Sequence, residues 1–201
     1  MLRWALEMAG LRDKKDFLTG SLPVGWKQRL ALGCAVLHEP KLLFLDEPTS
    51  GVDPASRRDF WELIGSMAES GTTVFVTTHY MDEAEHCDRL GLIYKGKLVT
   101  IGTPEDLKKS SMPGTVLEVR SDRALEAVEA VEELDGVLEA AVFGRNIHVV
   151  VEDPVRETST IKQACAARDI DITGIETIEP SLEDVFVSLI YAEDMANGAG
   201  D

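Results

Sequence analysis

The sequence predicts an α/β domain with a mainly parallel sheet over residues 1–110, followed by a small α+β domain over residues 111–190. The first part alternates apolar strands with helices, the pattern of a parallel sheet with crossover helices. The second part has the order strand, helix, strand, strand, helix, strand. A step in charge separates them, because residues 1–110 carry 14 basic and 16 acidic side chains and the rest carry 6 and 20.

The step in charge falls beside the segment SSMPG, residues 110–114. Small residues, a proline and a glycine in succession are typical of a linker. We therefore place the domain boundary at about residue 111. The last stretch, AEDMANGAGD, has no hydrophobic periodicity, so residues 191–201 are predicted to form a disordered tail.

Composition limits the possible classes of protein. The chain has 201 residues, of which 44% are hydrophobic, and no apolar run reaches the roughly 18–20 residues of a membrane span. Its start resembles an amphipathic helix and not a secretion signal. The three cysteines are far apart, which argues against a disulfide framework. A net charge of −16 that lies mostly in the second half argues against nucleic acid as a partner of that half.

The elements of the first domain follow from apolar periodicity and from capping residues. Asp53 and Pro54 are suited to the N-cap and first position of a helix, and Gly71 is suited to its end. The dipeptide Lys95-Gly96 is suited to a hairpin turn. The predicted elements are helices over 1–9 and 25–38, a strand over 41–46, a helix over 54–70, a strand over 72–79, a helix over 81–87, a hairpin over 89–102 and a helix over 103–109.

The second domain is predicted in the same way. Its elements are a strand over 115–121, a helix over 123–134, strands over 137–144 and 145–153, a helix over 159–169, a strand over 171–180 and a helix over 181–190. This βαββαβ order with one further helix matches the ferredoxin-like arrangement.

The segment LLFLDEPTSGVDP, residues 42–54, carries the clearest chemical signal. A strand predicted to be buried leads directly into two adjacent carboxylates, Asp46 and Glu47. Phosphoryl transfer uses such a pair, because one carboxylate holds Mg²⁺ and the next orients and deprotonates the attacking water. The alternative interpretation is an acidic turn after a buried strand.

Several motifs in succession carry a resemblance to a known family. They are LPVGWKQRL, HEPKLLFLDEP, SGVD, VTTH and MDEAEHCDRLGLIYKGKLVTIGTPEDL. Together they resemble the carboxy-terminal half of an ABC transporter nucleotide-binding domain, a P-loop-NTPase-like fold. The form LPxGWKQRL and the small acidic extension are similar to the ATPase subunits of drug exporters of the ABC-2 type.

The resemblance assigns roles to four residues around the two strands. Asp46 holds Mg²⁺, Glu47 is the catalytic base, and His79 donates a hydrogen bond to the γ-phosphate. Asp53 is the D-loop aspartate that faces the site of a partner domain. For Asp53, the alternative is a purely structural role as the N-cap of the next helix.

The signature motif departs from the family pattern, since residues 22–26 are Leu-Pro-Val-Gly-Trp where Leu-Ser-Gly-Gly-Gln is usual. Pro23 has no amide hydrogen, and Val24 adds bulk where a glycine would let the backbone approach a phosphate. Binding of a partner's nucleotide is then either weakened or supplied through Gly25 and the residues after it. The residues assigned to nucleotide contact are Leu22, Gly25, Trp26, Gln28 and Asp53.

The phosphate-binding loop G-x-x-x-x-G-K-[ST] does not occur in the 201 residues, and neither does the family's Q-loop. The nearest match, residues 20–27, has a tryptophan before its lysine and follows no apolar strand. We therefore expect the sequence to be part of a larger nucleotide-binding domain. By itself it is expected to hydrolyse no ATP and to be prone to aggregation.

The resemblance implies a function in transport. The expected protein is the ATPase component of an exporter, with ATP and Mg²⁺ as cofactors, working as a homodimer or a tandem of nucleotide-binding domains. Its expected partner is an ABC-2-type membrane permease, at the cytoplasmic face of the plasma (inner) membrane, with no nucleic acid. One alternative is a non-transport ABC protein of the translation-factor or DNA-repair type. Another places a small-ligand or dimerisation function in the second domain.

Overall fold

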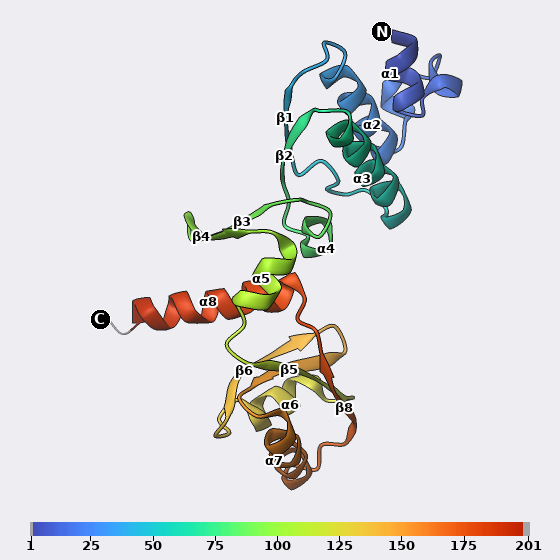
Figure 1. The fold of residues 1–201 in the computed structure, drawn as a ribbon. Helices are drawn as coiled ribbons and strands as arrows, with labels where there is room; N and C mark the ends of the chain where they lie inside the picture. Colours follow the sequence, from blue (N-terminus) through green and yellow to red (C-terminus); the bar gives the residue numbers. More distant parts are fainter. Residues whose placement is uncertain (1, 199–201) are drawn as a thin grey trace. The chain divides into compact units, whose positions relative to one another are not determined.

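A computed structural model describes residues 2–198 (Figure 1). The chain divides between His86 and Cys87 into two compact units. In the first unit, the elements are α1 Leu2–Met8, the 3-10 turns η1 Arg12–Lys14 and η2 Thr19–Ser21, α2 Val24–Ala35, β1 Leu42–Asp46, α3 Pro54–Glu69, β2 Thr73–Thr77 and α4 Met81–Ala84. Each predicted helix and strand of this part is present, with ends that differ by a few residues.

Strands β1 and β2 form a parallel pair, as predicted. Leu42 lies opposite Thr73, and Asp46 lies opposite Thr77, so the two strands end at the same level. The sequence predicted both strands to be buried, and this is wrong for one face. Leu43 is buried, whereas Phe44 and Phe75 are 68% and 58% exposed, because α2 and α3 lie to one side of the pair (Figure 1).

Helix α3 begins and ends where its sequence predicts. The side chain of Asp53 accepts a hydrogen bond from the backbone N–H of Ser56 at 3.0 Å, and Pro54 occupies the first helical position. Gly71 follows the helix with a φ of 96°, a left-handed conformation that favours glycine. The buried face of the helix consists of Phe60, Trp61, Ile64 and Met67, at helical spacing.

The second unit contains a hairpin, a four-stranded sheet and four helices among its described residues. Its elements are β3 Leu90–Tyr94, β4 Lys97–Gly102, α5 Pro104–Ser110, β5 Thr115–Ser121, α6 Ala124–Val131, β6 Val137–Phe143, β7 Asn146–Val151, α7 Pro154–Ala167, β8 Ile172–Ile178 and α8 Leu182–Gly198. Helix α7 begins earlier than predicted, because Asp153 caps it and Pro154 takes its first position.

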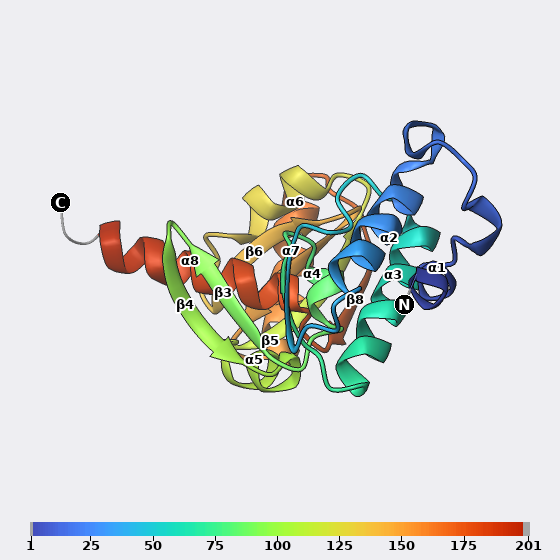
Figure 2. The same cartoon turned by 90° about the horizontal axis from the view of Figure 1, so that it is seen from above.

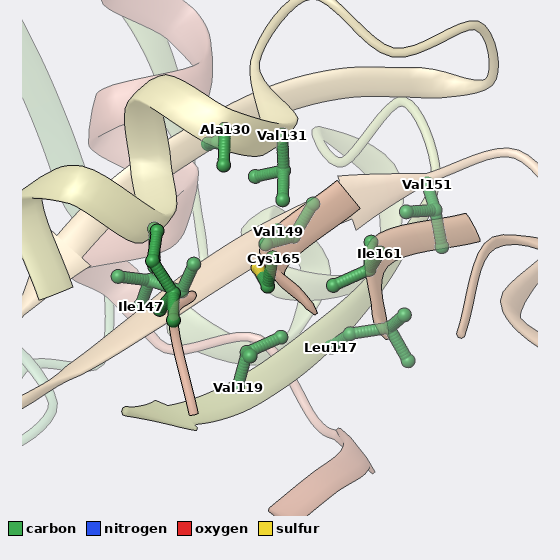
Figure 3. Close-up of a cluster of buried hydrophobic side chains, with 12 residues drawn as sticks. Leu117, Val119, Ala130, Val131, Ile147, Val149, Val151, Ile161 and Cys165 are labelled. Carbon is green, nitrogen blue, oxygen red and sulfur yellow. The ribbon is translucent and has the colours of Figure 1, made fainter. Parts of the chain in front are cut away.

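The four-stranded sheet has the order β6-β7-β5-β8 with every neighbouring pair antiparallel. This order and the βαββαβ succession confirm the ferredoxin-like prediction. One face of the sheet packs against α6 and α7, and Figure 3 shows side chains of β5, β7 and both helices meeting there. The labelled core residues are Leu117, Val119, Ala130, Val131, Ile147, Val149, Val151, Ile161 and Cys165.

Helix α8 packs through Leu182 and Val185, which are 1% and 0% exposed. It continues to Gly198, so the predicted disordered tail is wrong for residues 191–198; residues 199–201 lie outside the described part. The extra turns pair with the hairpin. Lys95 Nζ lies 2.6 Å from Asp194 Oδ1, and α8 runs beside β3 and β4 in Figure 2.

These contacts also explain where the compact units divide. The hairpin pairs with α8, and α5 also packs against α8. The hairpin and α5 therefore belong to the second unit and not to the first. The domain boundary near residue 111 remains a prediction from composition. The three cysteines are free thiols. No helix within residues 2–198 has both the length and the apolar character needed to cross a bilayer.

Candidate active site

The candidate site lies where β1 and β2 end. Because the strands are parallel and in register, their carboxyl ends place the residues that follow them at one edge of the sheet. Thr77, the last residue of β2, joins the two ends. Its carbonyl oxygen accepts from the Glu47 N–H at 3.0 Å, and its hydroxyl donates to Asp46 Oδ1.

Glu47 and His79 meet directly at this edge. His79 Nδ1 lies 3.2 Å from Glu47 Oε1. Both side chains are about half exposed, at 55% for His79 and 49% for Glu47, so they remain open to a reactant. The sequence-based prediction placed a carboxylate base and a histidine at this edge, and the structure brings these two side chains within ion-pair distance.

The backbone turns sharply at Glu47, which has a φ of 41° although it is not a glycine. Its N–H donates to Thr77, and its carbonyl oxygen accepts from the Ser50 N–H at 3.1 Å. These hydrogen bonds hold Glu47 in a left-handed backbone conformation that residues other than glycine rarely adopt. Unfavourable backbone conformations of this kind are concentrated at functional sites, where the surroundings over-determine them.

Asp53 lies farther along the same loop. Hydrogen bonds from the backbone and side chain of Ser56 hold the pKa of its carboxyl below the usual value. The structural role as the N-cap of α3 is therefore present. A role toward a partner domain remains a prediction.

The signature residues lie at the start of α2. Gly25 packs against Val52, which precedes Asp53, and against Ser56 in the first turn of α3, since an added Cβ would lie 3.0 Å from Ser56 Cβ and 3.3 Å from Val52 Cγ1. Its small size therefore serves the contact between α2 and α3. Leu22, just before α2, is buried, and Gln28 on α2 is half-buried.

Trp26 is half-buried beside a small apolar cluster of the first unit. It packs against Ala9, Leu11 and Leu22. Two cations flank its ring, with Lys14 Nζ 4.7 Å and Arg29 Cζ 5.4 Å from the ring centroids. These contacts favour a structural role for Trp26 within the helical part of the first unit.

Sequence reasoning missed two residues of this region, Thr77 and Glu83. Glu83 is only 1% exposed and accepts hydrogen bonds from Thr49 and Thr78. In the sequence it stands in the acidic run MDEAE, which is typical of a solvated helix face. Thr77 could have been found from the sequence, because it stands near the predicted end of the second strand. Parallel strands that end in register bring the residues at their ends together.

The fit of Mg²⁺ to this edge can be judged from the donors present. No group of three or more His, Cys, Asp or Glu side chains within the described residues is arranged to hold a metal by itself. Mg²⁺ is commonly held by one or two carboxylates together with substrate phosphates and water. The exposed carboxylate of Asp46, fixed by Thr77, suits that mode of binding.

Comparisons with known proteins show which family models and relatives the chain matches. The family model "ABC transporter" matches residues 2–50, and "ATP-binding protein DrrA1-3-like, C-terminal domain" matches residues 102–190. A third model, "AAA domain, putative AbiEii toxin, Type IV TA system", matches residues 28–81. The linearmycin resistance ATP-binding protein LnrL of Bacillus subtilis is 33% identical over 189 residues, 92% of this chain and 60% of LnrL.

The chain belongs to the ABC transporter ATP-binding protein family.

Other relatives extend the comparison. The probable multidrug ABC transporter ATP-binding protein YbhF of Escherichia coli is 62% identical over 105 residues, 52% of this chain and 18% of YbhF. The daunorubicin/doxorubicin resistance ATP-binding protein DrrA of Streptomyces peucetius is 32% identical over 90% of this chain and 56% of DrrA. The chain thus spans less than two thirds of the length of these relatives.

Solved structures support the fold. CbiO1 of Clostridium perfringens, part of the ABC transporter complex cbiONQ, is 32% identical with a TM-score of 0.50, covering 54% of this chain and 44% of that one. A nucleotide-free ATP-binding cassette from an ABC transporter, 24% identical, has a TM-score of 0.51 and covers 54% of this chain and 44% of that one. The predicted ABC ATPase fold is confirmed.

Proposed function

We propose that these residues form part of the ATPase component of an ABC exporter, which powers transport through a separate membrane permease. One observation carries the proposal. Asp46, Glu47 and His79 come from the ends of two neighbouring parallel strands, and His79 Nδ1 lies 3.2 Å from Glu47 Oε1. A metal-binding carboxylate, a base and a hydrogen-bond donor at one sheet edge are the groups that phosphoryl transfer to water requires.

Each side chain has a distinct role in this proposal. Mg²⁺, when bound at Asp46, would neutralise charge on the β- and γ-phosphate oxygens. Glu47 takes the proton of the attacking water, and its contact with His79 fixes the carboxylate in place. The imidazole of His79 donates a hydrogen bond to the oxygen on which negative charge develops.

A second nucleotide-binding domain completes the proposal. Asp53 and the first turn of α2 are offered to the nucleotide of a partner domain, in a homodimer or a tandem. The signature residues there are Leu22, just before α2, and Gly25 and Gln28 within the helix. The amino terminus of α2 supplies backbone N–H groups suited to an anion. The contact between Gly25 and Ser56 supports joint movement of the signature turn and the Asp53 loop.

The proposed partner is a permease of the ABC-2 type at the cytoplasmic face of the plasma (inner) membrane. LnrL and DrrA are named as resistance proteins, and YbhF is named as a probable multidrug transporter component. These names support drug export as the process. Co-purification of a polytopic membrane protein with the chain would test the partner.

The test of the chemistry uses an ATPase-competent form, in which these residues follow a phosphate-binding half taken from a relative. Glu47→Gln in that form should retain ATP binding and lose turnover by roughly 100-fold to 10,000-fold, the contribution of a general base. Glu62→Gln, at an exposed position of α3, is the matched control and should keep normal turnover. Normal turnover of Glu47→Gln would overturn the proposal.

The 201 residues by themselves are proposed to hydrolyse no ATP. The loop whose amides and lysine bind the phosphates is not among them, and positioning accounts for a large part of the barrier reduction. A phosphate-release assay on the purified chain checks this. Release that depends on Glu47 would contradict it.

A further inference from the structure

The first unit contains a buried carboxylate outside the group formed by Asp46, Glu47 and His79. Glu83, on the short helix α4, is 1% exposed. Burial of a carboxylate is costly unless hydrogen bonds and an opposite charge compensate for it. The hydrogen-bond and ion-pair partners of Glu83 therefore show which parts of the molecule the buried carboxylate holds together.

The two oxygens of Glu83 serve two different loops. Oε1 accepts a hydrogen bond from the hydroxyl of Thr49 at 2.5 Å, in the loop after β1. Oε2 accepts from the hydroxyl of Thr78 at 2.7 Å, in the segment after β2. Thr49 is itself 1% exposed, so both ends of the first bond are shielded from water.

An arginine from a third element balances the charge. Arg57 Nε, on α3, lies 3.4 Å from Glu83 Oε1, and Arg57 Cζ lies 4.2 Å from the Tyr80 ring centroid. Asp82 lies beside the same guanidinium at 3.7 Å but is 74% exposed. The buried network thus joins α3, α4 and both loops through Glu83.

The loops that Glu83 joins are those that carry the proposed catalytic side chains. Thr49 is two residues beyond Glu47, and Thr78 immediately precedes His79. Thr77 ties the loops at the strand ends, and Glu83 ties them a second time through Thr49 and Thr78. Two ties between the loops that carry Glu47 and His79 restrict how far these two side chains can separate.

We propose that Glu83 is a positioning residue, whose buried carboxylate sets the separation of Glu47 and His79 by holding Thr49 and Thr78. The positioning is argued from the hydrogen bonds of Glu83, and its effect on the reaction rate rests on the proposed ATPase function. Loss of the carboxylate should let the two loops move independently. Positioning errors of about 1 Å cost up to roughly 100-fold in rate.

The first test measures amide hydrogen exchange in the 201-residue chain and needs no ATPase activity. The reporters are the N–H groups of Glu47 and Tyr80, which bond to Thr77 and to the Thr78 hydroxyl. Glu83→Gln should speed their exchange by about tenfold, the effect of losing one hydrogen bond to a charged group. Amides within the β1–β2 ladder should keep their rates.

Matched variants separate positioning from general stability. Asp82→Asn makes the same change of charge at the exposed neighbour and should leave both reporters unchanged. Thr49→Val removes one hydroxyl at constant shape and should speed exchange at Glu47, whereas Thr49→Ser keeps the hydroxyl and should restore it. Unchanged reporters in Glu83→Gln would overturn the proposal, and so would equal acceleration of reporters and ladder amides.

The second test uses the ATPase-competent form. Glu83→Gln should lower kcat by roughly 10-fold to 100-fold with little change in KM for ATP. An unchanged kcat, or a rise in KM alone, would overturn the proposed role. Failure of the ATPase function itself would show as full turnover of Glu47→Gln, a result that leaves the exchange measurements standing.

Discussion

Gly25 and Ser56 lie so close that a Cβ on the glycine would be 3.0 Å from the Cβ of the serine. The two residues belong to different helices, α2 and α3, and Ser56 is also the residue whose N–H donates to Asp53. The glycine of the signature motif therefore fixes the distance between the start of α2 and the Asp53 loop. The narrow space beside Ser56 therefore favours a glycine at this position of the motif.

Gly25→Ala should destabilise the first unit by about 1–3 kcal/mol, the cost of overpacking a tight contact. The higher helix propensity of alanine offsets up to about 1 kcal/mol of this. Chemical denaturation checks the prediction. Gly65→Ala, in the exposed middle of α3 with no atom within 4 Å of the new methyl group, is the control and should stabilise the chain. Stabilisation by both changes would contradict the close contact.

The sequence predicted most of what depends on local pattern. Apolar runs and capping residues such as Asp53 located nearly every element, and the parallel order placed Glu47 and His79 at one edge. What depends on distant partners was not predictable. The last turns of α8 are held by Lys95 and Asp194, which are far apart in the sequence, and Glu83 stands in an acidic run whose burial only the folded loops reveal.

Asp184 should make the second unit sensitive to acid. Burial raises the pKa of its carboxyl, but hydrogen bonds from His148 and Ser181 outweigh this and leave the pKa lowered. A lowered pKa gives stability that is present above the unfolded value and lost as pH falls through the folded one. Asp184→Asn should therefore cost about 1–3 kcal/mol at neutral pH, with a smaller difference from the parent below about pH 4.

Thermal unfolding of the parent and Asp184→Asn across pH 3–8, roughly the window around the carboxyl pKa values, measures this difference. Glu183→Gln changes the exposed neighbour on α8 and serves as the control. A difference that stays constant into acid would show that the carboxylate of Asp184 contributes through shape and not through charge.

Glu139 should have the opposite pH dependence. Burial raises the pKa of its carboxyl, with the nearby charge of Asp184 acting in the same direction and the hydrogen bond from Ser188 opposing both. A raised pKa means that stability is lost as pH rises through the folded value. Glu139→Gln keeps an acceptor for Ser188 without the charge, so it should raise the melting temperature by a few degrees at neutral pH.

The gain from Glu139→Gln should disappear in acid, where the parent carboxyl is already protonated. Melting temperatures at neutral and acidic pH check this, and Glu129→Gln on the exposed face of α6 is the control. A gain of the same size at both pH values would place its cause outside the titration of Glu139.

The exposed face of the β1–β2 pair should cause self-association of the 201-residue chain. Phe44 and Phe75 stand with ring centroids 5.6 Å apart, and Leu42 beside them is 51% exposed. An apolar face on strands with unpaired edges is a template for contact with other chains. Phe44→Thr keeps a residue suited to strands and removes the largest exposed ring, so it should lower the association seen by sedimentation over a concentration series.

Leu125→Thr is the control for this change, because Leu125 is 73% exposed as a single apolar residue on α6. Isolated apolar residues at a surface are ordinary and cause no association by themselves. Only the paired aromatic face should therefore respond. One leucine on a helix offers neither a flat apolar surface nor free backbone groups to another chain. Equal effects of the two substitutions would therefore mean that total surface hydrophobicity, and not the face of the β1–β2 pair, governs association.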